Sequence, residues 1–130
     1  MNAVRSSDFQ WHARAVSILP GGNATNFALQ AAALGMPTTL VAAVGKDAMA
    51  EILRGAYREY GVGARLVVDP TRPTGTTMAL TWTNGRRGLI TASGANAGLT
   101  ERGVPLHAME GAAHVHRAGF WWTAALIGTP

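Results

Sequence analysis

The chain has 130 residues, of which 48% are hydrophobic and 14% charged, and it contains no cysteine. Such a chain forms at most one small domain, and its apolar content supports a buried core, which argues against wholesale disorder. The lack of cysteine excludes disulfides and cysteine-based zinc sites. The net charge of +4 comes mainly from scattered arginines, and only Arg86 and Arg87 are adjacent, so we expect no nucleic-acid partner.

No segment predicts export or membrane insertion. Asp8, Gln10 and His12 occupy the region where a signal peptide would need an apolar core. The longest apolar runs, at 31–36 and 40–44, are far shorter than a membrane span. We therefore expect a soluble, cytoplasmic protein without a membrane partner.

The first half of the chain predicts strands that alternate with helices. Residues 13–19 are expected to form a strand, and Asn23 is expected to cap a helix that continues through Leu34. The β-branched, apolar run at 38–44 is typical of a buried strand. Asp47 is the expected cap of a second helix that reaches about Tyr60. This alternation predicts a layered α/β fold.

The second half of the chain favours β-structure. The expected elements are a strand at 65–68, a hairpin with strands 76–83 and 89–92, a short helix within 101–109 and a strand at 114–120. Asn84-Gly85 lies between the hairpin strands and predicts a type I′ turn, because both residues tolerate a positive φ. Alternation puts Met78, Leu80 and Trp82 on one face, which fits ordinary core packing as well as a functional apolar surface.

The double glycine Gly21-Gly22 is the segment best suited to binding a ligand. Without Cβ atoms a ligand can approach the backbone closely, and the helix that follows offers free N–H groups. Asn26, one turn inside the helix, can both donate and accept hydrogen bonds. Local physics alone nevertheless favours a tight turn with a helix cap, since neither a Walker loop nor a dinucleotide fingerprint is present.

Five short motifs together resemble those of ribokinase-like (PfkB) carbohydrate and nucleoside kinases. They are Gly-Gly-Asn-Ala-Thr-Asn-Phe-Ala at 21–28, Val-Gly-Lys-Asp at 44–47, Tyr-Gly-Val at 60–62, Pro-Thr-Gly-Thr-Thr at 73–77 and Ser-Gly-Ala-Asn at 93–96. Each motif is weak alone, but all five occur in the family's order within residues 18–120. The chain is therefore similar to the amino-terminal part of such a kinase.

The resemblance implies a three-layer α/β/α fold with a small β lid. Residues 1–130 would form a partial kinase domain, with lid strands at about 64–69 and 74–92. Gly21, Gly22 and Asn26 would contact hydroxyls of the acceptor, and Asn23 stands where family members differ. The expected lid residues are Thr74, Gly75, Met78, Leu80 and Trp82.

The resemblance also implies transfer of the ATP γ-phosphoryl group, with Mg²⁺, to a hydroxyl of a sugar or nucleoside. The family's Gly-Ala-Gly-Asp motif, which supplies the general base and an anion hole, does not occur in this sequence. We therefore assign no catalytic residue and expect the 130-residue chain alone to bind ATP and Mg²⁺ poorly and to be inactive. The family lid often pairs with a second subunit, so a homodimer through the lid is also implied. Two alternatives stay open: a non-catalytic sugar-binding or dimerisation module, and an inactive truncated product.

His114 and His116 flank Val115 and would point to one side of a strand, as metal ligands do. A third ligand is missing nearby, and Glu110 is the nearest acid. We therefore expect no metal site.

Overall fold

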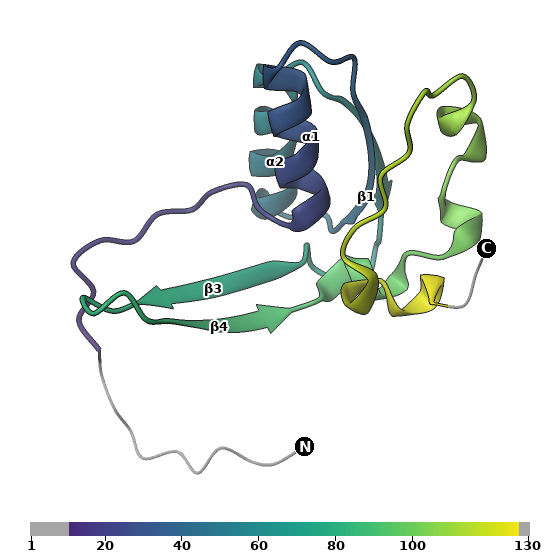
Figure 1. Cartoon of the computed structure of the whole chain (residues 1–130). Coiled ribbons are helices and arrows are strands. Elements are labelled where there is room, and N and C mark those ends of the chain that lie inside the picture. Colours follow the sequence, from purple (N-terminus) through teal and green to yellow (C-terminus); the bar gives the residue numbers. More distant parts are fainter. Residues whose placement is uncertain (1–10, 128–130) are drawn as a thin grey trace.

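The structure, a computed structural model, describes residues 11–127 and places them in two regions (Figure 1). The first region is an α/β unit, whose elements are α1 (Asn23–Ala33), β1 (Thr39–Val44), α2 (Ala48–Glu59) and β2 (Gly63–Val68). The second region is a hairpin of two strands, β3 (Thr76–Thr81) and β4 (Arg87–Ala92). After the hairpin the chain forms short 3₁₀ turns joined by irregular segments, at 94–98, 101–103, 106–109, 120–122 and 124–126.

The α/β unit is built around two parallel strands. Thr39 of β1 lies opposite Gly63 of β2, and Val44 lies opposite Val68. The helices α1 and α2 run alongside one another and opposite to the strands, so both helices begin at the edge where the strands end (Figure 1). Neither helix, nor any other within residues 11–127, is long and apolar enough to cross a membrane.

The core of this unit lies between the helices and one face of the strands. Ala28 of α1, Leu40 of β1, Tyr57 of α2 and Val62 form its buried cluster. Tyr57 is 1% exposed, and its hydroxyl shares a hydrogen bond of 2.9 Å with the Thr25 hydroxyl. Burial of the apolar helix faces against the strands therefore stabilises the unit.

The opposite face of the strands is covered by the segment that follows the hairpin. Ala43, which points away from the helices, packs with Ala95 and Leu99, and Val67 borders this second cluster. Within residues 11–127 this cover consists of 3₁₀ turns and not of α-helices. The α/β class is thus confirmed, with one α-helical layer in the part of the chain that the structure describes.

Within residues 11–127, two expected strands are absent, and one expected helix has a different form. Residues 13–19 and 114–119 have no regular structure, and the expected helix within 101–109 is two separate 3₁₀ turns. A β-like pattern needs a neighbouring backbone that completes its hydrogen bonds, and neither segment is paired to a strand. The lid strand expected at 64–69 corresponds to β2, but β2 pairs with β1 in the α/β unit.

The hairpin has an exposed surface on both sides. β3 and β4 pair antiparallel, with Thr76 opposite Ala92 and Thr81 opposite Arg87. This register puts Met78 and Leu80 on one face, and the Trp82 ring lies on the same face beside Gly88, the partner of Leu80. The three side chains remain 59%, 39% and 37% exposed.

The turn of this hairpin differs from the expected type I′ turn. The Trp82 N–H donates to the Arg86 carbonyl at 2.9 Å, which leaves a three-residue loop at 83–85. Gly85 has a φ of +80°, whereas Asn84, like every non-glycine residue within 11–127, avoids positive φ. A three-residue loop with one left-handed glycine joins antiparallel strands without placing Asn84 in that region.

Candidate functional site

The double glycine forms the turn that starts α1. Gly22 holds the capping position with a φ of +95°, and its carbonyl accepts the Asn26 N–H at 2.9 Å. Asn23 is the first helical residue and makes no capping bond, so the expectation that Asn23 caps α1 is wrong. The helix starts one residue earlier than expected, so Asn23 holds the first helical position and Gly22 the capping position.

The four predicted binding residues lie together on the surface. Gly21, Gly22, Asn23 and Asn26 are all exposed. A Cβ placed on Gly21 or Gly22 would meet no atom within 4 Å, so a ligand has open access to the backbone. Within residues 11–127 neither asparagine side chain has a hydrogen-bond partner. The first turn of α1 therefore presents free N–H groups beside two amides that both donate and accept.

The base of the hairpin lies at the edge of the molecule where α1 begins. α1 begins where β1 ends (Figure 1), and Gly45, directly after β1, donates its N–H to the Thr74 hydroxyl at 3.0 Å. From Thr74 and Gly75 the hairpin projects outward, so Met78, Leu80 and Trp82 lie farther along it. The structure thus brings the double glycine and the first two predicted lid residues to one edge.

Asp47 links this edge to the hairpin, a role that sequence reasoning missed. Its Oδ1 accepts the Ala50 N–H at 3.0 Å, which confirms the expected cap of α2. The same oxygen accepts the Thr74 hydroxyl at 2.7 Å, and Oδ2 accepts the Thr74 N–H at 2.6 Å. These bonds, above all the one from the Thr74 hydroxyl, hold the pKa of Asp47 below its usual value.

Three glycines allow the backbone segments at the hairpin base to approach closely. A Cβ on Gly45 would lie 2.6 Å from the Arg72 carbonyl oxygen. A Cβ on Gly75 would collide with Asn96, and one on Gly94 with the Pro73 carbonyl. The motifs at 44–47, 73–77 and 93–96, far apart in sequence, therefore pack against one another here.

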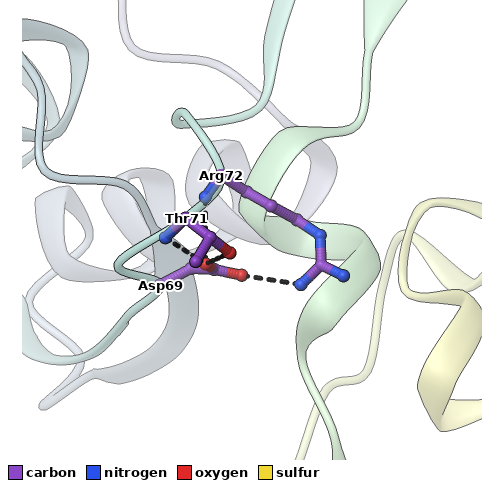
Figure 2. A network of polar contacts seen from close by, with 3 residues as sticks. All are labelled: Asp69, Thr71 and Arg72. Atoms are coloured by element: carbon purple, nitrogen blue, oxygen red, sulfur yellow. Dashed lines mark hydrogen bonds and ion pairs between the residues drawn. The ribbon is translucent and has the colours of Figure 1, made fainter.

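Asp69 organises the loop between β2 and β3 (Figure 2). Its carboxylate accepts the N–H and the hydroxyl of Thr71, both at 2.8 Å, and the N–H of Arg72 at 3.0 Å. The Arg72 guanidinium donates to its other oxygen at 2.9 Å. These bonds, led by the Thr71 N–H, hold the pKa of Asp69 far below its usual range.

This loop borders a depression of about 340 Å³ on the side of the strands away from the helices. Asp69 and Arg72 line it together with Ala43, Ala95 and Leu99, whereas the double glycine does not. Asp69 and Arg72 neutralise each other there, so the depression lacks an unpaired charge that would attract an ionic ligand.

The two histidines considered as metal ligands contact α1 instead. The His116 ring stacks on Phe27 with centroids 4.0 Å apart, and His114 lies 6.5 Å from the same ring. Within residues 11–127 no group of three or more histidine and acidic side chains is placed to hold a metal ion.

Comparisons with known proteins agree with the fold and the motifs. A model of the pfkB family of carbohydrate kinases matches residues 3–126. The bifunctional protein HldE of Azorhizobium caulinodans is 51% identical over 59 residues, which are 44% of this chain and 12% of that protein. The ribokinase of Arabidopsis thaliana, complexed with ribose and ATP, is 29% identical and has a TM-score of 0.59, over 67% of this chain and 29% of that one.

A solved adenosine kinase from Anopheles gambiae is 28% identical, with a TM-score of 0.59 over 64% of this chain and 25% of that one. The chain thus spans less than a third of the length of each of these relatives. The family model, however, covers nearly the whole chain. This chain belongs to the pfkB family of carbohydrate kinases.

Proposed function

We propose that Gly21, Gly22 and Asn26 bind hydroxyl groups of a sugar or nucleoside acceptor in an ATP-dependent phosphoryl transfer. The observation that carries this proposal is the exposed double glycine, with Gly22 at φ +95°, beside the free first turn of α1. Hydroxyls both donate and accept, which suits backbone N–H groups next to an asparagine amide. The solved relatives that bind ribose with ATP, or that are adenosine kinases, support this class of acceptor.

The described residues are better suited to binding an acceptor than to catalysing phosphoryl transfer. Phosphoryl transfer needs a group that accepts the acceptor's proton and donors that stabilise the developing charge. Asp47 and Asp69 are the acids nearest the family motifs, but both accept several hydrogen bonds that lower their pKa. A carboxylate stabilised in this way is a weak base. We therefore expect the 130-residue chain, incubated with ATP, Mg²⁺ and a panel of sugars and nucleosides, to release no acceptor-dependent ADP.

Titration of the chain tests the binding site directly. Ribose, fructose or adenosine, added with and without ATP, should shift the amide NMR signals of Gly21, Gly22 and Asn26 first. Gly22→Val should abolish these shifts, because a β-branched residue is strained at positive φ and fills the open space above the turn. Gly35→Val is the matched control, since Gly35 has a φ of +83° at the other end of α1. An unchanged acceptor affinity in Gly22→Val would refute the site.

A second copy of the chain is the partner that we propose for the hairpin. Met78 and Ile90 lie opposite each other on one face and are 59% and 65% exposed, while Leu89 on the other face is 56% exposed. Such a surface on a two-stranded sheet favours an apolar cover. Sedimentation velocity should show a dimer that Met78→Glu with Ile90→Lys converts to monomer. A strict monomer at high concentration of the unmodified chain would contradict this association.

A further inference from the structure

We propose that Asp47 and Thr74 form an anchor that sets the position of the β3–β4 hairpin relative to the double-glycine turn. Asp47 and Thr74 would thus be positioning residues for acceptor binding, a role that rests on the proposed function of Gly21 and Gly22. The anchor itself is a property of the fold and can be tested without any ligand.

Asp47 connects two regions of the molecule through both of its carboxylate oxygens. On one side it caps α2, whose Tyr57 is part of the buried core. On the other side it accepts the N–H and the hydroxyl of Thr74, two residues before β3 begins. Hydrogen bonds to an ionised carboxylate are about twice as strong as those between neutral groups. The link therefore extends the rigidity of the core to the start of the hairpin.

The other end of the hairpin is fixed to the same place. Ala95, three residues after β4 ends, is 0% exposed, and its N–H donates to the Pro73 carbonyl at 2.7 Å. Thr74, only 5% exposed, lies between this segment and Gly45, whose N–H it accepts. Entry and exit of the hairpin thus meet in one packed block around Thr74.

Few other contacts hold the hairpin within the part of the chain that the structure describes. No residue of β3 or β4 is buried. Farther from the base, Trp82 contacts Trp11 edge to face, and Trp11 is itself 61% exposed. A six-residue strand is roughly 20 Å long, so a rotation of about 10° at its base moves the turn by roughly 3 Å. A displacement of that size is enough to change the contacts that residues farther along the hairpin make with an acceptor.

Thr25 provides a matched control for Thr74. Both threonines are buried, at 6% and 5% exposure, and both use their hydroxyl in a hydrogen bond. The Thr25 hydroxyl shares a hydrogen bond with the Tyr57 hydroxyl. This bond joins α1 to α2 inside the core and does not involve the hairpin base. Valine has nearly the shape of threonine without the hydroxyl. Thr25→Val therefore removes one hydrogen bond inside the core, whereas Thr74→Val removes the hydroxyl bonds to Asp47 and Gly45 at the hairpin base.

The absence of cysteine makes the position of the hairpin measurable. Spin labels on Glu59→Cys, at the end of α2, and Arg86→Cys, at the hairpin turn, occupy exposed positions in the two regions. Pulsed dipolar spectroscopy should give one narrow distance distribution for the parent and for Thr25→Val. We expect a distribution at least twice as broad in Thr74→Val and in Asp47→Ala, and a narrow one again in Thr74→Ser, which keeps the hydroxyl.

An unchanged distribution in Thr74→Val would overturn the anchor. If Thr74→Val fails to fold by circular dichroism, Asp47→Asn replaces it. Its amide oxygen still caps α2, but its nitrogen cannot accept the Thr74 N–H. The same broadening is then expected, and its absence overturns the proposal equally.

Acceptor titration of the same variants separates this proposal from the proposed function. We expect the affinity for the acceptor that binds the parent to fall about tenfold in Thr74→Val, and to stay unchanged in Thr25→Val and Thr74→Ser. If Thr74→Val broadens the distance distribution but binds as tightly as the parent, the positioning role is wrong. If no acceptor shifts the double glycine in the parent while the broadening is seen, the proposed function fails and the anchor stands.

Discussion

The α/β unit and the hairpin contain similar residues but are stabilised in different ways. In the unit, Val44 and Tyr57 are almost completely buried. In the hairpin, Met78, Leu89 and Ile90 carry equally apolar side chains and remain more than half exposed. Apolar composition therefore determines burial only where a second layer covers it. The unit is held by its core, whereas the place of the hairpin depends on polar contacts at its base.

This contrast predicts that a core substitution has the largest effect on stability. Tyr57→Ala removes a side chain that is 1% exposed and leaves the Thr25 hydroxyl without its partner. We expect a loss of about 3–5 kcal/mol in the free energy of unfolding, as for other buried aromatic residues. Urea denaturation followed by circular dichroism measures it.

Tyr60→Ala is the control, because Tyr60 lies at the end of the same helix and is 46% exposed. Its loss should stay within about 0.5 kcal/mol. Similar losses in the two variants would show that the unit does not depend on its core as the structure indicates.

The same contrast explains how much of the fold could be predicted from the sequence. The elements of the α/β unit were predicted within a few residues, because their periodicity and the Asp47 cap are local signals. The strand expected at 114–120 failed because a strand depends on a partner, and the described backbone is not paired there. The sheet to which a strand belongs is equally hard to predict, because no local sequence signal indicates whether β2 pairs with β1 or with the hairpin.

The candidate site shows the same division. The double glycine could be found from the sequence, because two glycines before a helix leave the backbone open to a ligand and the segment resembles a motif of the family. The link from Asp47 to Thr74 was not found, because the two residues are 27 positions apart and each has a local explanation. Only the fold brings the two motifs together.

An intermediate effect is expected where the two regions meet. Gly45→Ala would place a Cβ 2.6 Å from the Arg72 carbonyl and 2.7 Å from the Thr74 nitrogen, both of them backbone atoms. We expect a loss of about 1–3 kcal/mol from overpacking. Faster amide hydrogen exchange at Thr74 and Ala95 would locate the damage.

Gly55→Ala, inside α2 with no atom within 4 Å of the new Cβ, is the opposite case. It should stabilise the protein by about 0.5–1 kcal/mol through helix propensity. If Gly45→Ala proved equally harmless, the close packing of the hairpin base would be wrong.

A smaller effect is expected from acid. Because hydrogen bonds from Thr71 and Arg72 lower the pKa of Asp69 in the folded protein, its contribution is complete above the unfolded pKa of about 3.9. That contribution is lost as the pH falls through the lower folded pKa. The urea midpoint of the parent should therefore decrease as the pH falls below about 4. The urea midpoint of Asp69→Asn should decrease less over the same pH range. An identical acid dependence in Asp69→Asn would show that these bonds do not stabilise the loop.

The smallest effect on stability is expected from the aromatic pair at the outer part of the hairpin. Trp11 and Trp82 pack edge to face with centroids 5.8 Å apart, and the Trp82 ring lies over Gly88. Because Trp11 is 61% exposed and outside both buried clusters, Trp11→Ala should change the free energy of unfolding by no more than about 0.5 kcal/mol. The fluorescence of Trp82 should nevertheless shift to longer wavelength as water replaces the ring. A large loss of stability in Trp11→Ala would mean that the segment around Trp11 and the hairpin share a core. The hairpin would then be held along its length and not mainly at Thr74.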